Sequence, residues 1–167
     1  TLHKKLPDMI EYLESKKNIF EKKLNTNATF LTEKLCHSIF ENNFNQLVVS
    51  ADHYEKNEFE KLRKNSKFEV VVKNVDMLFG IRERYFPNSI TEIRVSGIDA
   101  SRKLDRKKFH DFWIKRSDQV SAGFPMERWD TYNNDIHKEI NDPCEQLWDR
   151  MYVWFDGKVN PCDADYK

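Results

Sequence analysis

The sequence predicts an α/β protein built on a parallel sheet, and three observations lead to that prediction. Short β-branched runs such as Leu47–Val49 alternate with longer segments whose apolar residues recur at helical spacing. Gly and Pro number only four and five in 167 residues, so no low-complexity linker is expected. Aromatic residues make up 13% of the chain, which provides large side chains for a core. Strands that alternate with helices pair in parallel, because each helix returns the chain to the same end of the sheet.

The first 64 residues predict three helical segments and two strands. Pro7 suits the first turn of a helix, and Thr32 suits the N-cap of another. The expected order is a helix at 6–13, an extended stretch at 20–26, a helix at 31–42, a strand at 47–49 and one or two helical turns at 55–64.

The next 60 residues repeat this alternation. A long apolar stripe predicts a helix at 68–85 that ends before Pro87, and Gly97 is expected to close a strand at 92–96. A helix around 109–113 and a strand at 119–124 follow. Four strands between residues 20 and 124 are either half of a TIM-type barrel or the middle of an open sheet.

Ligands bind at the carboxyl ends of the strands in both architectures. The residues that follow each predicted strand are therefore the first candidates for a site. They are Thr26-Asn27, Ser50-Ala51-Asp52, Gly97-Ile98-Asp99 and Gly123-Phe124.

Charge and cysteine usage limit the classes of partner and compartment. The 28 basic and 28 acidic side chains balance, so nothing favours nucleic acid or a membrane surface as a partner. No apolar run approaches the roughly 20 residues of a membrane helix, and no signal peptide is recognised. Three cysteines without an export signal fit a reducing cytoplasm better than a disulfide framework.

The C-terminal part, residues 128–167, is expected to begin a small second domain. Asp156-Gly157 between apolar runs predicts a β-hairpin with both residues at positive φ. Cys144 precedes this hairpin and Cys162 follows it, so a bend could bring both thiols to one end. They could be unrelated, half of a zinc site or part of an iron–sulfur site, and each metal site needs further ligands.

The spacing of these two cysteines resembles a known motif. Cys144, twelve residues, Gly157, four residues and Cys162 match the start of the auxiliary-cluster (SPASM) domain of radical S-adenosylmethionine enzymes. Pro161 and Asp165 around the second cysteine are also typical of that domain. The resemblance implies that Cys144 and Cys162 are ligands of an auxiliary 4Fe-4S cluster, whose other ligands lie outside this chain.

The region before residue 128 is similar to the barrel of the same family. Thr26-Asn27 resembles the end of its third strand, and Ser50-x-Asp52 resembles the fourth-strand motif associated with S-adenosylmethionine. Arg63 stands where relatives often place an arginine for the methionyl carboxylate, and a guanidinium fork suits that task. The resemblance thus implies that residues 1–127 hold the third to sixth strands of a partial barrel. The Cys-x3-Cys-x2-Cys loop for the catalytic cluster would precede Thr1.

Each candidate also has an ordinary structural interpretation. Ser50 and Asp52 could be turn or helix-cap residues, and Asn27 could tolerate left-handed backbone geometry. Arg63 could be a solvated charge on a helix, and Cys36 is expected to lie in the core.

The resemblance implies a cytoplasmic oxidoreductase that cleaves S-adenosylmethionine to a 5′-deoxyadenosyl radical. Its substrate would be a peptide, a sugar or another small molecule, and a reductant protein would be its partner. The chain is then a fragment that is expected to be inactive alone, with its catalytic residues unassigned. The alternative is a non-catalytic α/β binding module with a zinc- or cysteine-containing hairpin.

Overall fold

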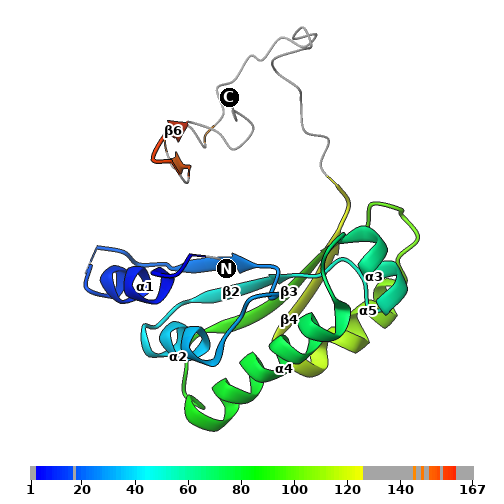
Figure 1. Cartoon of the computed structure of the whole chain (residues 1–167), viewed down its shortest axis with the longest axis horizontal. Helices are drawn as coiled ribbons and strands as arrows, with labels where there is room; N and C mark the ends of the chain where they lie inside the picture. Colours follow the sequence, from blue (N-terminus) through cyan, green and yellow to red (C-terminus); the bar gives the residue numbers. More distant parts are fainter. Residues whose placement is uncertain are drawn as a thin grey trace, which may run out of the picture. The chain divides into compact units, whose positions relative to one another are not determined.

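The computed structural model describes residues 3–16, 18–125, 145, 148, 151–154 and 156–160 (Figure 1). Contacts between residues divide the chain into two units, Thr1–Pro125 and Met126–Lys167. Each unit has its own secondary structure and is described by itself.

The first unit alternates helices and strands as the sequence predicts. Its elements are α1 (Leu6–Glu14), β1 (Lys23–Thr26), α2 (Glu33–Glu41), β2 (Gln46–Ser50), α3 (Lys56–Leu62), α4 (Phe68–Tyr85), β3 (Glu92–Ile98), α5 (Arg106–Trp113), the 3₁₀ turn η1 (Ile114–Arg116) and β4 (Gln119–Gly123). All the predicted helices and strands of this unit are therefore confirmed.

Local chemistry fixes several of the helix ends. The Thr32 hydroxyl accepts a hydrogen bond from the Leu35 N–H at 3.3 Å, so Thr32 is the N-cap of α2 as expected. Asp105 caps α5 in the same way through the Lys108 N–H at 3.0 Å. Helix α4 ends at Tyr85, because the residue before a proline is disfavoured in helical geometry and Phe86 precedes Pro87.

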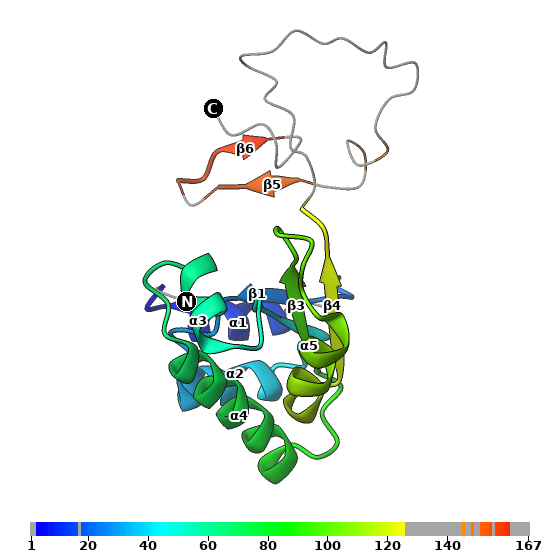
Figure 2. The same ribbon diagram turned by 90° about the vertical axis from the view of Figure 1, so that its right-hand side faces the viewer.

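The four strands of the first unit form one parallel sheet whose spatial order, β1-β2-β3-β4, equals their order in the chain. Crossovers between parallel strands are generally right-handed, and with this strand order that handedness puts successive helices on the same face of the sheet. Figure 2 shows α1, α2, α4 and α5 on one side of the strands. This arrangement is compatible with part of a barrel and with part of a Rossmann-like open sheet.

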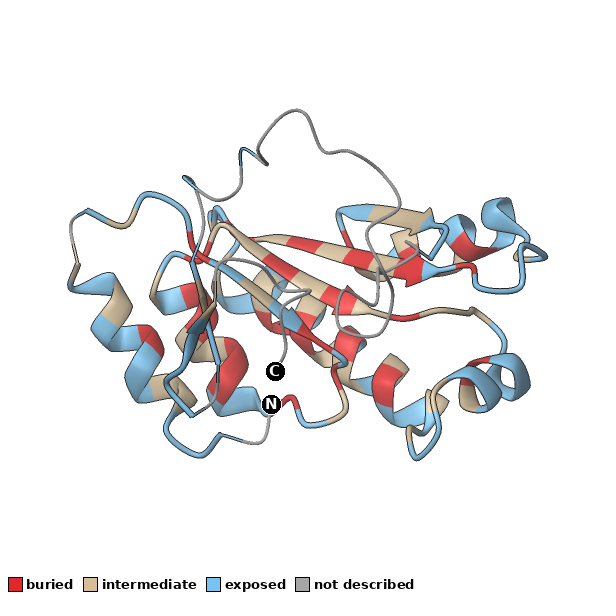
Figure 3. Ribbon diagram, turned by 90° about the horizontal axis from the view of Figure 1, so that it is seen from above, coloured by how far each residue is buried: buried red, intermediate tan, exposed pale blue. Residues whose placement is uncertain are grey.

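The core lies between the sheet and its helices. Alternate strand residues such as Val49 and Val95 are fully buried there, against α4 and α5 residues such as Val75 and Trp113. Cys36 of α2 is also fully buried, which confirms it as a core residue. Figure 3 shows the resulting alternation along the strands between buried and partly exposed residues.

The other face of the sheet carries polar side chains and no helix of the first unit. The alternation places on it the residues Lys23, Asn25, Gln46, Val48, Ser50, Glu92, Arg94, Ser96, Ile98, Gln119, Ser121 and Gly123. We call this set the open face. Neighbouring strands align it in rows, since Ser50 pairs with Ser96 and Ser96 pairs with Ser121 in the sheet register.

One detail of the strands differs from the prediction. Gly97 does not close β3, because the strand continues through it to Ile98. In the second unit the hairpin is present, as β5 (Tyr152–Val153) paired antiparallel with β6 (Val159–Asn160). Its turn hydrogen bond joins the Gly157 N–H to the Trp154 C=O at 2.9 Å, and Gly157 has a φ of +86°. The expectation of a positive φ is confirmed at Gly157, and at Asp156 it stays a prediction.

None of the described helices is both long enough and apolar enough to cross a membrane.

Candidate functional site

The carboxyl ends of the four strands lie side by side at one edge of the sheet. The register pairs Thr26 with Val49, Ser50 with Ser96, and Ile98 with Gly123. All the sequence-predicted positions of the first unit that follow a strand therefore gather at this edge, because parallel strands end in the same direction.

The turn after β1 is held by its own side chains. The Thr26 hydroxyl accepts the Ala28 N–H at 3.0 Å, and the Asn27 carbonyl oxygen accepts the Thr29 N–H at 3.1 Å. Ala28, and not Asn27, takes the left-handed conformation, with a φ of +59°. The left-handed interpretation of Asn27 was therefore wrong. Thr26 is buried and Asn27 is exposed, so only the amide of Asn27 is open to solvent.

Asn74 of α4 fixes the same turn, and sequence reasoning missed it. Its Nδ2 donates to the Ala28 C=O at 2.8 Å and to the Thr29 C=O at 3.2 Å. A polar residue inside an otherwise apolar helical stripe was the only signal that could have indicated it.

Asp52 and Arg63 meet directly. Arg63 Nε lies 2.8 Å from Asp52 Oδ2, and the two side chains are 23% and 17% exposed. This contact is an ion pair without hydrogen-bond alignment, since the buried Arg63 Nε makes no geometrically acceptable hydrogen bond. Asp52 Oδ1 accepts the Ile98 N–H at 3.0 Å. The carboxylate thus joins the ends of β2 and β3 to the C-terminus of α3.

These contacts decide between the interpretations of both residues. Asp52 is not the cap of α3, whose N-cap is Glu55. Arg63 is half-buried and paired, so it is not a solvated charge. No hydrogen bond to its Nη groups is formed by the described part of the chain, which leaves these donors available to a ligand.

Ser50 lies at the end of β2 on the open face and is half-buried. Its hydroxyl forms no hydrogen bond within the described residues, so it is neither a turn nor a cap residue. This hydroxyl, two positions before Asp52 and without a partner among the described residues, can donate to or accept from a polar ligand.

Asp99 shapes the loop after β3 and was not assigned a role from the sequence. It is 4% exposed, and its Oδ1 accepts the N–H groups of Lys103 at 3.1 Å and Leu104 at 3.3 Å. This carboxylate is used to order the chain between β3 and α5, which leaves it little capacity for a ligand.

The structure describes one of the three cysteines, Cys36. Cys144 and Cys162, the predicted cluster ligands, lie outside the described residues. Desolvation by burial raises the pKa of the Cys36 thiol to about 12, so this thiol is protonated at neutral pH. Within the described ranges, no group of three His, Cys, Asp or Glu residues is placed to hold a metal ion.

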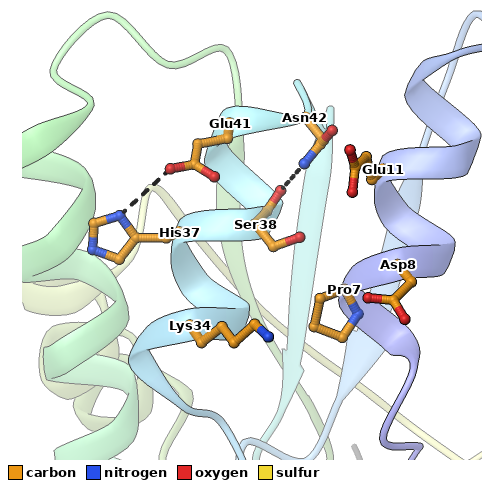
Figure 4. A pocket seen from close by; sticks show the side chains of 8 residues that line it. All are labelled: Pro7, Asp8, Glu11, Lys34, His37, Ser38, Glu41 and Asn42. Carbon is orange, nitrogen blue, oxygen red and sulfur yellow. Dashed lines mark hydrogen bonds and ion pairs between the residues drawn. The ribbon is translucent and has the colours of Figure 1, made fainter.

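The surface between α1 and α2 contains a pocket of about 470 Å³ that the sequence did not indicate. Figure 4 shows its lining, where His37 and Glu41 approach each other at 3.9 Å along α2. Its walls include exposed charged side chains such as Glu11 and Lys34. None of the predicted cofactor-binding residues lines this pocket.

Comparison with known proteins gives no match, either to a protein-family model or to a curated sequence.

Proposed function

We propose that this chain is an interior part of a radical S-adenosylmethionine enzyme with an auxiliary-cluster domain. Residues 1–127 would be the third to sixth strands of its barrel, and residues 128–167 the start of that domain. The observation that carries the proposal is the convergence of Thr26-Asn27, Ser50, Asp52 and Arg63 at one carboxyl edge of a singly wound parallel sheet. Barrel enzymes place their chemistry at that edge.

The described residues at the edge fit the polar ends of S-adenosylmethionine. Asn27 and Ser50 offer an exposed amide and a free hydroxyl for the ribose or the amino group. Arg63 is held by Asp52 through Nε and keeps its Nη donors for the methionyl carboxylate. Asp52 then acts as a positioning residue, because it fixes the guanidinium that would bind the cofactor.

An iron–sulfur cluster and S-adenosylmethionine would supply the radical chemistry of the complete enzyme. Within this chain, the sheet would orient the cofactor, and Arg63, positioned by Asp52, would hold its carboxylate end. Cys144 and Cys162 would contribute two thiolates to the auxiliary cluster, and the remaining ligands would come from beyond Lys167.

The first test is the coding sequence around this chain and the polypeptide it encodes. A Cys-x3-Cys-x2-Cys motif is expected within about two βα units, each of about 30 residues, before Thr1. The complete polypeptide, reconstituted with iron and sulfide without oxygen, is expected to release 5′-deoxyadenosine from S-adenosylmethionine when reduced. No release of 5′-deoxyadenosine and no bound iron would refute the proposal.

Cysteine variants of the complete polypeptide test the second unit. The double variant Cys144→Ser, Cys162→Ser is expected to lose the iron of one cluster, whereas Cys36→Ala is the matched control and should keep all of it. Equal iron content in the two variants would reject the assignment of Cys144 and Cys162. Zinc in place of iron, with no turnover, would support the non-catalytic binding module instead.

A further inference from the structure

The open face of the sheet carries an arginine whose surroundings differ from those of the other partly buried arginines. The structure describes four arginines that are neither exposed nor fully buried, and three of them contact a carboxylate. These contacts are Arg63 Nε to Asp52 at 2.8 Å, Arg82 Nη2 to Asp118 at 2.8 Å and Arg116 Nε to Asp76 at 2.6 Å. Arg94 is the fourth, and no carboxylate of the described residues lies within ion-pairing distance of it.

Arg94 lies near the middle of β3, on the open face. Its Nη2 donates to the Ser121 hydroxyl of β4 at 2.9 Å, and that hydroxyl donates to the Ser96 hydroxyl at 3.5 Å. Its Nε is buried and has no hydrogen-bond partner in the structure. Among the described residues, the guanidinium therefore has one hydrogen-bond partner for its five N–H donors.

The nearest acidic residue on the same face does not satisfy this charge. Glu92 precedes Arg94 by two positions, and its Oε2 accepts a hydrogen bond from Gln46 Nε2 at 2.8 Å. Glu92 is therefore hydrogen-bonded to Gln46, the residue with which it pairs in the sheet register. Arg94 pairs in the register with Val48 and Gln119, neither of which is charged.

The guanidinium of Arg94 is a cation whose Nε–H donor is buried. A buried N–H donor without a hydrogen-bond partner lowers stability, and a ligand that accepts hydrogen bonds from the guanidinium would remove this cost. Its planar fork matches the two oxygens of a carboxylate or of a phosphate group. Hydroxyls such as those of Ser96 and Ser121 can donate to the same oxyanion.

We infer that Arg94, together with Ser96 and Ser121, binds the oxyanion group of a carboxylate- or phosphate-bearing ligand on the open face. The inference goes beyond the proposed function, which assigns the carboxylate of S-adenosylmethionine to Arg63. It assigns a second, anionic ligand to the sheet, and it depends only on the described geometry of β3 and β4.

The test follows the side-chain N–H signals of arginine by NMR in the 167-residue chain. Sodium phosphate and sodium succinate are each titrated against sodium chloride at matched ionic strength, and the Arg94 signal is identified by its absence from the Arg94→Gln spectrum. A saturable shift of the Arg94 Nε–H signal with either anion is expected. Phosphate alone would indicate a phosphorylated ligand, and succinate alone would indicate a carboxylate.

Variants show whether the anion binds at Arg94. Arg94→Gln should weaken binding at least tenfold, and Arg94→Lys, which keeps the charge without the fork, should weaken it less. Arg84→Gln removes an exposed arginine of α4 that rests over the Tyr85 ring, and this matched control should bind as the parent chain does.

Two results would overturn the inference. The first is the absence of any saturable Arg94 shift in the unsubstituted chain, a measurement that needs no variant to fold. The second is anion binding of equal affinity in Arg94→Gln and Arg84→Gln. If S-adenosylmethionine saturates the Arg94 signal with the same affinity in the parent chain and in Arg63→Gln, the assignment of a second ligand is overturned. Failure to cleave S-adenosylmethionine would reject only the proposed function.

Discussion

Replacement of Gly97 by alanine tests the close approach of β2, β3 and α5 at the carboxyl edge. A Cβ at this position would lie 2.5 Å from the Ala51 carbonyl oxygen and 2.9 Å from Cζ of Phe109. Both distances are shorter than 3.0 Å, and Cβ atoms in real structures essentially never come that close to another heavy atom. Ala51 and Phe109 are both buried. The backbone of β2 or the ring of Phe109 would have to move. Overpacking of this kind costs about 1–3 kcal/mol, so we expect Gly97→Ala to lower the free energy of unfolding by that amount.

Gly80→Ala is the matched control. Gly80 is an exposed residue inside α4, and a Cβ at this position would have no neighbouring atom within 4 Å. Alanine favours a helix over glycine by about 1 kcal/mol, so this variant should be more stable than the parent chain. Urea denaturation followed by circular dichroism measures both changes. Opposite signs for the two variants are expected. A neutral or stabilising Gly97→Ala would show that β2 and α5 do not approach β3 as closely as described.

Three further perturbations have definite expected results. In a double-mutant cycle measured by urea denaturation, the effects of Asp52→Asn and Arg63→Gln on the free energy of unfolding should couple by about 1 kcal/mol, because the pair is half-buried. A coupling energy of zero would contradict the ion pair. Burial is the largest single effect on the pKa of the Asp118 carboxyl and raises it. The hydrogen bonds from Arg82 and from the Ile93 N–H, together with the positive charge of Arg82, outweigh it and hold this pKa below the usual 3.8. Ionised Asp118 therefore stabilises the folded chain at pH values above 3.8, and this contribution is lost as the pH falls through the lower folded-state pKa. Asp118→Asn should therefore flatten the acid limb of a pH–stability curve. Cys36 should react with a thiol reagent only as fast as the first unit unfolds, since it is buried and burial raises the pKa of its thiol to about 12. The labelled cysteine is identified by peptide mass, and rapid labelling of Cys36 in the folded chain would contradict its burial.

The elements of the first unit could be predicted from the sequence because each one depends on local signals. Apolar spacing gave α1, α2, α4 and α5, and the β-branched run at Leu47–Val49 gave β2. Thr32 caps α2 as its position predicts, because an N-cap bond joins residues only three apart. The parallel pairing of the strands followed from their alternation with helices, so the candidate edge of the sheet was also predictable.

The contacts within the site could not be read from the sequence. Asp52 and Arg63 are eleven positions apart, and their pairing depends on the length and direction of α3. Asn74 reaches the turn after β1 across 46 positions, and no local pattern specifies that distance. Gly97 was expected to end a strand, yet its small size is required inside one, where β2 and α5 come closest.

The sequence by itself determined the alternation of helices and strands, the capped helix ends and the edge of the sheet at which polar residues collect. Periodicity and capping act over a few residues, so the order of amino acids is sufficient to specify them. Only the tertiary structure decided which charges are paired, because that depends on side chains brought together from distant strands and helices. Arg63 therefore proved to be held by Asp52, whereas Arg94, on a strand whose polar face carries no helix of the first unit, has no carboxylate partner within the described residues.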